Sequence, residues 1–200
     1  MNTGDHWESV WQRVPVEQAG WYQAVPRLSL ELVEDAGLAP DDPIVDVGGG
    51  ASSLADRLVA NGHRDVTVLD ISPSAIAQAS ARSARADVIA WVVGNVLDGL
   101  ERTYALWHDR AVFHFLTGAD RMRYLEALGD ATRTGGWAII ATFGPKAPPT
   151  CSGLPVTRYD AAALSRALGA AFDTVRFDLE HHTTPGGIVQ EYVYGLFRRT

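Results

Sequence analysis

From residue 43 onward, short runs of β-branched and aliphatic residues alternate with segments whose apolar positions recur at helical spacing. Nearly uniform apolar runs are typical of strands that are buried on both faces of a sheet. The predicted strands span residues 43–47, 65–70, 87–94, 104–109 and 136–143. The predicted helices span residues 52–62, 72–86, 118–133 and 161–170. Strands separated by helices predict a parallel sheet that is built of right-handed crossovers.

The pattern changes after the last of these helices. Two long strand-like runs, 172–182 and 188–199, are joined by the turn-forming residues 184–187. A connection this short requires antiparallel neighbours. We therefore predict an α/β fold with a doubly wound, Rossmann-like sheet of seven strands, mainly parallel with an antiparallel last strand.

Residues 1–40 precede the sheet and carry several aromatic residues close together, namely Trp7, Trp11, Trp21 and Tyr22. We interpret this segment as helices that lie across the open edge of the sheet. Because the chain has no internal repeat or linker, we expect a single domain whose core spans residues 41–200.

Composition and charge exclude several classes of protein. The net charge is −7 and the 17 basic residues are scattered, which argues against a nucleic-acid partner. The N-terminal stretch is polar and acidic, unlike a signal peptide, and no apolar run approaches the roughly 18 residues of a membrane span. The single Cys151 cannot form an internal disulfide, and no His/Cys spacing suggests a metal site. We therefore expect a cytoplasmic protein with no membrane partner and no metal.

The first strand ends in a loop that carries both an acid and three glycines. Gly48, Gly49 and Gly50 allow a tight turn and let a ligand approach the backbone. The dinucleotide motif fits poorly, because its third glycine would fall on Ser53 and Asp46 would repel a pyrophosphate. A carboxylate at Asp46 suits a ligand that carries an ammonium group.

Polar residues also follow the next two strands. Asp70 ends the second strand. Its spacing in sequence from the glycine loop is about that of the acid that binds the hydroxyl pair of a ribose in nucleotide-binding folds. After the third strand, the side-chain oxygen of Asn95 can accept from an adenine amino group, and the Val96 amide can donate to the ring. Ligands bind outside the carboxyl ends of the strands in open α/β sheets, so these residues predict an adenosine site there.

Over residues 40–200 these motifs resemble the class I S-adenosylmethionine-dependent methyltransferases. "IVDVGGGAS", "VTVLDIS" and "WVVGNV" look like their first three motifs, and "TRTGGWAII" looks like the segment before their fifth strand. The N-terminal aromatic run and "WHDRAVFHFLT" further resemble a subfamily of small bacterial members. Asn95, Thr134 and Ala105 stand where the family usually has Asp, Pro and Asp.

The resemblance implies that S-adenosyl-L-methionine is the cofactor and S-adenosyl-L-homocysteine its product. It implies that Asp46 and the glycine loop hold the methionine moiety, that Asp70 takes both ribose hydroxyls, and that N-terminal aromatic residues close over the cofactor as a lid. The residues to which it gives a cofactor-binding role are Trp21, Tyr22, Asp46, Gly48, Gly49, Gly50, Asp70, Ile71, Asn95, Val96 and His108.

The stretch "YALWHDRAVFHFL" (104–116) places ionisable residues among apolar ones, and we expect the chain to leave the strand at His108–Asp109 and to enter a helix near Ala111. The fourth strand of this fold ends beside the transferred methyl group, so these residues are expected at the rim of the active site. If the acceptor must lose a proton, Asp109 or His114 is the candidate catalytic base. The structural alternatives are a backbone-bonded strand terminus at His108 and an Asp109–Arg110 ion pair that fixes the loop.

The loops 143–160 and 180–187 are expected to form the second wall of the cleft. Within them, Cys151 either contacts substrate or packs as a small apolar residue. His181 and His182 point to opposite faces if the strand continues through them.

Together these features predict methyl transfer to a small-molecule acceptor, since the chain has no appended recognition domain. One alternative is a protein lysine methyltransferase, which would need an open acidic groove. Another is a non-catalytic module that binds S-adenosylmethionine. Base-amino methylation of nucleic acid is disfavoured, because the fourth strand ends in "HDRA" and not in a Pro-Pro-aromatic signature.

Overall fold

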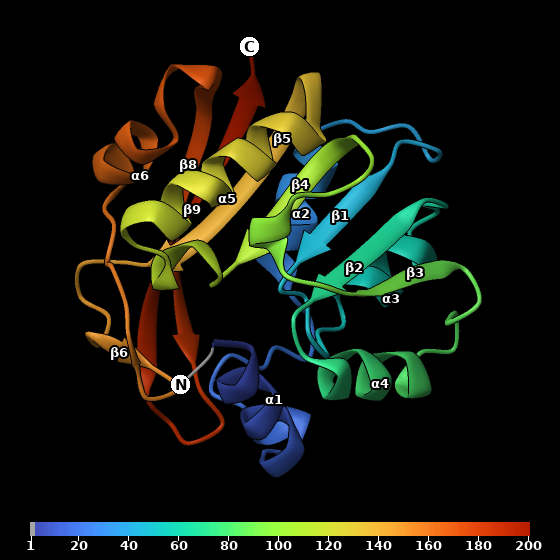
Figure 1. Ribbon diagram of the computed structural model, residues 1–200, viewed down its shortest axis with the longest axis vertical. Helices are drawn as coiled ribbons and strands as arrows, with labels where there is room; N and C mark the ends of the chain where they lie inside the picture. Colours follow the sequence, from blue (N-terminus) through green and yellow to red (C-terminus); the bar gives the residue numbers. More distant parts are fainter. Residues whose placement is uncertain (1–2) are drawn as a thin grey trace.

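The computed structural model of the protein describes residues 3–200, in which a seven-stranded sheet carries helices on both faces (Figure 1). The strands of this sheet are β1 (Ile44–Val47), β2 (Val66–Asp70), β3 (Ile89–Val93), β4 (Tyr104–Arg110), β5 (Thr132–Phe143), β8 (Phe172–Thr183) and β9 (Val189–Arg199). Their order is β3-β2-β1-β4-β5-β9-β8. Neighbours among β1 to β5 pair in parallel, and β9 pairs antiparallel with β5 and β8. The predicted fold class is confirmed.

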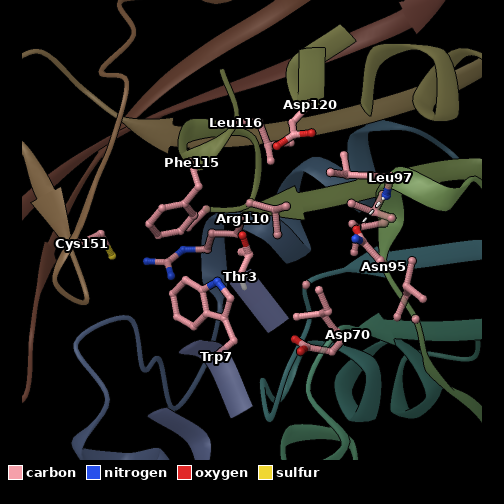
Figure 2. Close-up of a pocket in the computed structure, with 18 of the residues that line it drawn as sticks. Thr3, Trp7, Asp70, Asn95, Leu97, Arg110, Phe115, Leu116, Asp120 and Cys151 are labelled. Atoms are coloured by element: carbon pink, nitrogen blue, oxygen red, sulfur yellow. Dashed lines mark hydrogen bonds between the residues drawn. The ribbon is translucent and has the colours of Figure 1, made fainter. Parts of the chain in front are cut away.

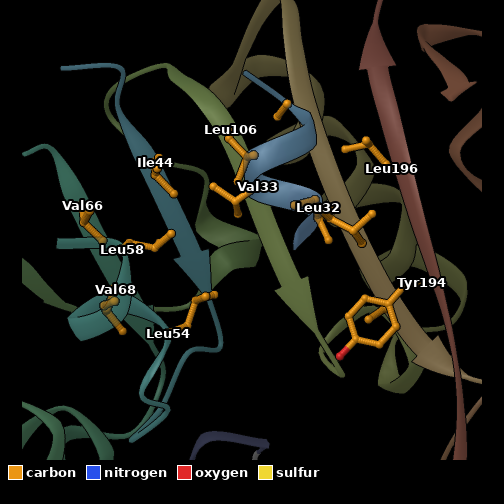
Figure 3. Close-up of a cluster of buried hydrophobic side chains, with 14 of the residues drawn as sticks. Leu32, Val33, Ile44, Leu54, Leu58, Val66, Val68, Leu106, Tyr194 and Leu196 are labelled. Atoms are coloured by element: carbon orange, nitrogen blue, oxygen red, sulfur yellow. The ribbon is translucent and has the colours of Figure 1, made fainter. Parts of the chain in front are cut away.

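The core consists of two apolar layers, because successive side chains of a strand point to opposite faces of the sheet. On one face, Ile44 and Leu106 join a buried cluster with α2 (Arg27–Asp35) and α3 (Leu54–Ala60) (Figure 3). On the other face, the neighbouring residues of β1 and β4 join a cluster with α5 (Gly118–Ala131) and α6 (Ala161–Leu168). Burial on both faces accounts for the uniform apolar runs in the sequence.

The position of α2 corrects one prediction. Leu32 and Val33 are buried in the same cluster as Ile44 and Leu196, so α2 covers a face of the sheet and does not lie across its edge. The part of the N-terminal segment that remains for a lid precedes α2 and holds α1 (Thr3–Arg13), the short helix η1 (Val16–Gln18) and Trp21. In Figure 1, α1 lies beside α4 (Pro73–Arg82), apart from both layers of the core.

All four predicted helices end before the predicted residue, with α3 ending at Ala60 and α6 at Leu168. α4 ends at Arg82 and not at residue 86, because Ser83 is extended and its hydroxyl bonds to Asp56 and to the Arg85 amide. α5 ends at Ala131, where the chain passes directly into β5.

The connection after β4 differs more strongly from prediction. We expected a helix to begin near Ala111, but Ala111 has a φ of +81°, a conformation that non-glycine residues rarely adopt. A short 3₁₀ helix, η3 (Phe113–Phe115), follows it, and α5 begins only at Gly118. The sharp turn at Ala111 decides where the polar residues of this stretch point.

A small hairpin, β6 (Thr150–Cys151) with β7 (Leu154–Pro155), lies in the long loop after β5. In the described part of the chain, no helix is long and apolar enough to cross a membrane.

Candidate active site

A cavity with a volume of about 320 Å³ lies at the carboxyl ends of the parallel strands. Figure 2 shows that its lining side chains come from the strand ends on one side and from α1 on the other. The predicted site residues that line this cavity are Trp21, Gly48, Asp70, Ile71, Asn95 and Val96. A neighbouring cavity of about 50 Å³ is lined by Trp21, Tyr22, Asp46, Gly48, Gly49 and His108. Gly50, Asp109 and His114 line neither of the two.

The glycine loop is shaped by close packing above it. Gly48 has a φ of +64°, and a Cβ there would overlap Val112 of the loop after β4. Gly50 has a φ of +50°, and its Cβ would lie 2.5 Å from the Trp11 ring. Both positions therefore require glycine.

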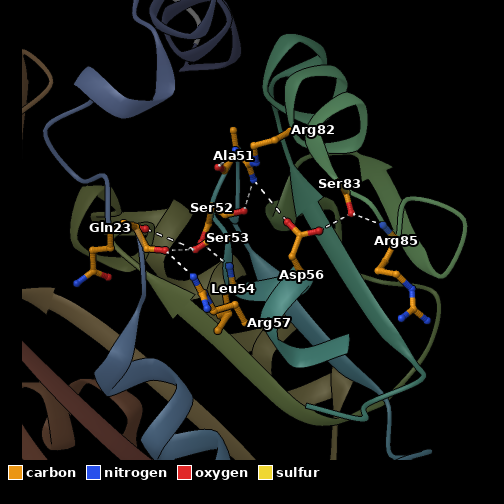
Figure 4. A network of polar contacts seen from close by, with 11 residues as sticks. Gln23, Ala51, Ser52, Ser53, Leu54, Asp56, Arg57, Arg82, Ser83 and Arg85 are labelled. Atoms are coloured by element: carbon orange, nitrogen blue, oxygen red, sulfur yellow. Dashed lines mark hydrogen bonds and ion pairs between the residues drawn. The ribbon is translucent and has the colours of Figure 1, made fainter. Parts of the chain in front are cut away.

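A polar network holds the chain just after this loop (Figure 4). The Arg82 guanidinium at the end of α4 donates to the carbonyls of Ala51 (2.7 Å) and Ser52 (2.8 Å). Arg57 donates to the carbonyl of Ala24, which ties α3 to the segment before α2. The loop is thus fixed from two sides before any ligand binds.

Asp70 is a buried carboxylate at the end of β2. It accepts hydrogen bonds from the backbone amides of Ser72 (2.8 Å) and Gly50. Burial raises the pKa of Asp70 to about 6, although these two bonds oppose the shift. Two carboxylate oxygens offer about four acceptor positions, so acceptor capacity remains for a pair of hydroxyls.

Asn95 follows β3 as predicted, but its side chain has a local partner. Its Oδ1 accepts from the Leu97 amide at 3.0 Å and caps the short helix η2 (Val96–Asp98). The predicted bond from an adenine amino group would have to share this oxygen.

Asp46 and His108 form a buried pair beside the glycine loop. His108 Nδ1 lies 2.7 Å from Asp46 Oδ1, and His108 Nε2 lies 2.9 Å from Ser29 Oγ. The Asp46 oxygen predicted to face an ammonium group is therefore already bonded to a histidine. The structural alternative expected His108 to be bonded to the backbone, but two side chains hold its ring.

The two candidate bases both point into the core. The Asp109 carboxylate accepts from the amides of Val112 and Phe113 and from the Tyr124 hydroxyl, and burial raises its pKa to about 6. His114 is fully buried, and its Nδ1 accepts from the backbone amide of Phe143 at 3.1 Å.

Burial also lowers the pKa of His114 to about 3, so the imidazole is neutral at physiological pH. Since neither Asp109 nor His114 reaches a cavity, their positions do not fit the predicted catalytic role. The expected Asp109–Arg110 ion pair is also absent from the salt bridges of the described residues, where Arg110 pairs with Glu180.

The sequence predicted an N-terminal lid with Trp21 and Tyr22 as its site residues, but Trp7 and Trp11 of α1 were not among the predicted site residues. Trp7 and Trp11 line the main cavity, and each makes an edge-to-face contact with Trp21, at centroid distances of 5.9 and 5.5 Å. Glu8, between them, accepts hydrogen bonds from Ser72 and Ser74 at the start of α4, and these bonds lower its pKa to about 2. The i, i+4 spacing of the two tryptophans was the available signal of a shared helix face.

The end of β4, the stretch after it and the loop after β5 also reach the site. Arg110, Phe115 and Cys151 line the main cavity. Cys151 is buried as well, so its position is compatible with either interpretation of this residue, and burial raises the pKa of its thiol. As predicted, the two histidines of β8 diverge: His182 is buried against the Gly20 carbonyl (2.8 Å), and the side chain of His181 is exposed.

No group of three or more His, Cys, Asp or Glu side chains that could hold a metal ion occurs among residues 3–200.

Comparisons with known proteins agree with this geometry. Residues 45–138 match the family model of a methyltransferase domain. A solved S-adenosylmethionine-dependent methyltransferase from Anabaena variabilis ATCC 29413 shares 16% identity, with a TM-score of 0.76 over 100% of this chain and 96% of that one. Magnesium protoporphyrin IX methyltransferase from Synechocystis PCC 6803, solved with bound S-adenosyl-L-homocysteine, shares 18% identity, with a TM-score of 0.71 over 100% and 95% of the two chains.

A third structure comes from a study of the conversion of a disulfide bond into a thioacetal group during echinomycin biosynthesis. It shares 21% identity, with a TM-score of 0.77 over 98% of this chain and 93% of that one. At these identities the structural likeness concerns the fold, and the family model adds the methyltransferase domain itself. Residues 45–138 thus resemble a methyltransferase domain, and the chain as a whole shares the fold of solved S-adenosylmethionine-dependent methyltransferases.

Proposed function

We propose that the protein transfers the methyl group of S-adenosylmethionine to a small-molecule acceptor. The observation that carries this proposal is the cavity of about 320 Å³, which α1 covers from one side and Cys151 of β6 lines from the other. This volume is within the range of small-molecule sites. A helix that covers the cavity favours a compact acceptor over a protein side chain, which would need an open groove.

The residues at the cavity fit the cofactor. Asp70 keeps acceptor capacity for the ribose hydroxyls, and Gly48 lines the same cavity. Ile71 and Val96 supply apolar surface at the same end. When it is bound there, S-adenosylmethionine supplies a methyl group that is already activated on a sulfonium.

The contribution of the chain is then alignment and exclusion of water. The titratable side chains that line the cavity in the described part are Asp70, Arg110, Asp120, Arg123 and Cys151. Asp120 is exposed, and burial raises the pKa of the Cys151 thiol, which favours its protonated form. Among the described residues that line the cavity, none next to Arg110 is a carboxylate or an imidazole, so we attribute the rate enhancement mainly to proximity and orientation.

We further propose that α1 and Trp21 form the lid over the site. Trp7 and Trp11 cover the strand ends from α1, and Glu8 fixes this helix to the start of α4. A lid of this kind excludes water from the transfer step when it closes.

The test of the proposed function is transfer of radiolabel from S-adenosylmethionine to a panel of small thiols, phenols, amines and carboxylic acids, run beside a protein lysate. We expect label in at least one small molecule and none in protein. Label confined to lysine side chains would refute the small-molecule assignment. Tight binding of cofactor with no labelled product from either panel would favour the non-catalytic module.

A further inference from the structure

Arg110 is a cation held in the wall of the cavity with its guanidinium directed away from the cofactor half of the site. Asp70 ends β2 and Asn95 follows β3, and both of these strands lie on one side of β4. The partners of Arg110 belong to the other side: Nε donates to Tyr194 Oη on β9 at 2.7 Å, and Nη2 lies 3.4 Å from Glu180 Oε2 on β8. Arg110 therefore faces the part of the cavity that is left for the acceptor.

The guanidinium is rigidly placed by these contacts. Its central carbon lies 4.2 Å from the centre of the Tyr192 ring, and Nη1 donates to the Trp21 carbonyl at 3.0 Å. Its side chain is 10% exposed. A side chain fixed in this way loses little conformational freedom when it binds a ligand.

Two donors of this guanidinium remain available. An arginine carries five N–H groups. Among the described residues, each of the three Arg110 nitrogens has one acceptor, so three of the five groups are in use. The second hydrogen on each of Nη1 and Nη2 thus has no acceptor in the described part of the chain. Two N–H groups on neighbouring nitrogens match the two oxygens of a carboxylate.

The surroundings of these donors are apolar. Trp7, Phe115 and Cys151 line the same cavity as Arg110, and in Figure 2 the guanidinium of Arg110 points toward the side on which Cys151 lies. The ring centroids of Trp7 and Phe115 are 5.1 Å apart. Low polarity strengthens an ion–ion contact, and the buried cation opposes the entry of a positively charged acceptor.

We propose that the acceptor is a small carboxylic acid with an apolar body, and that its carboxylate binds Arg110. This inference rests on the proposed function, since it names the substrate class of the same site. Glu180 is the competing anion for Arg110, but its carboxylate also accepts from Gln23 at 2.7 Å and from Tyr194 at 3.2 Å. The charge of Glu180 is thereby shared among several donors.

The experiment is calorimetric titration of the protein, saturated with S-adenosyl-L-homocysteine, with three probes on one aromatic frame: benzoate, benzamide and benzylamine. We expect benzoate to bind at least about tenfold more tightly than benzamide, as a charge-assisted contact should, and benzylamine not to bind. Equal binding of benzoate and benzamide, or no binding of benzoate, would overturn the proposal.

Variants separate a ligand contact from a structural role. Glu180→Gln removes the competing anion and should tighten benzoate binding several-fold. The double variant with Arg110→Gln and Glu180→Gln avoids a buried unpaired charge and should lose the preference for benzoate. Arg123→Gln is the matched control, because Arg123 lines the same cavity but pairs with Asp98. Its benzoate affinity should not change.

The affinity for S-adenosyl-L-homocysteine is measured first in every variant. If the double variant loses this affinity in proportion to its loss of benzoate, Arg110 holds the cofactor's own carboxylate and the acceptor assignment is wrong. If the wild-type protein does not bind S-adenosyl-L-homocysteine at all, the proposed function itself fails, and the inference fails with it. If the double variant does not fold, tighter benzoate binding by Glu180→Gln still supports the proposal, and unchanged binding refutes it.

Discussion

Asp70→Asn should make the protein more stable without ligand and impair cofactor binding. In the wild type, an ionised carboxylate is buried at the end of β2, with two backbone amides as partners. The pKa of Asp70 is raised from 3.8 to about 6, which means that the folded state disfavours the ionised form. A site that retains such a cost is consistent with selection for binding a ligand and not for stability.

The magnitude follows from proton linkage. At pH 8 the unfolded and folded states both carry the ionised form, and the shift corresponds to about 3 kcal/mol of lost stability. At pH 5 the folded carboxyl is mostly protonated, so the cost is about half as large. Asparagine removes this cost but weakens one amide bond by about 1 kcal/mol. The variant should therefore gain about 2 kcal/mol at pH 8, which is roughly 4–8 °C in Tm, and close to nothing at pH 5.

The assay combines urea denaturation of the apoprotein at both pH values with titration of S-adenosyl-L-homocysteine. We expect the cofactor affinity to fall at least about tenfold, because the charged hydrogen bonds to the ribose hydroxyls are weakened. A variant that is less stable than the wild type at pH 8 would contradict the burial argument. Wild-type cofactor affinity would show that Asp70 does not bind the ribose.

Three further substitutions probe the loop, the core and the lid. Gly48→Ala adds a Cβ to a residue with a φ of +64°, where it would overlap the neighbouring side chain. We expect the free energy of unfolding, measured by urea denaturation, to fall by at least about 2 kcal/mol. An unchanged denaturation midpoint would contradict this geometry. His114→Gln removes a buried neutral imidazole whose pKa is about 3, well below its unfolded value. The stability of the wild type relative to this variant should fall as pH drops from 7 to 4, because the unfolded histidine takes up a proton and the folded one does not. The pH profile of methyl transfer should be the same in the variant and the wild type. If the variant loses the acidic limb of that profile, His114 acts as a base after all. Cofactor binding should slow amide exchange across roughly residues 5–25, and Trp21→Ala should weaken cofactor affinity more than it lowers the stability of the apoprotein. Equal protection from exchange with and without cofactor would make the aromatic residues of this segment purely structural.

The parts of the fold and site that could be predicted depend on local signals. The buried strands appear as apolar runs, and Gly48 and Asp70 follow two of them directly, so their common edge is a consequence of parallel topology. Contacts between distant segments give no such signal. Trp11 packs against Gly50, and this contact requires the docking of α1 on α4, which neither segment encodes alone.

His114 shows how one backbone angle changes a functional prediction. A helix beginning near Ala111 would have left His114 one turn further along the rim of the site. The positive φ of Ala111 redirects the chain, and His114 enters the core against Phe143. Nothing in the residue type of Ala111 signals this conformation, because alanine rarely adopts it.

The alternation of side chains along β4 decides which of its polar residues can act at the site. His108 and Arg110 point to the α2 face of the sheet, where their partners are Ser29 and Tyr194. Asp109 points to the α5 face and binds Tyr124. Successive strand residues must face opposite ways, so a carboxylate and a cation adjacent in sequence cannot both enter one cavity from this strand. Arg110 is the member of this pair that lines the cavity, and the proposed binding of an anionic acceptor depends on that choice of face.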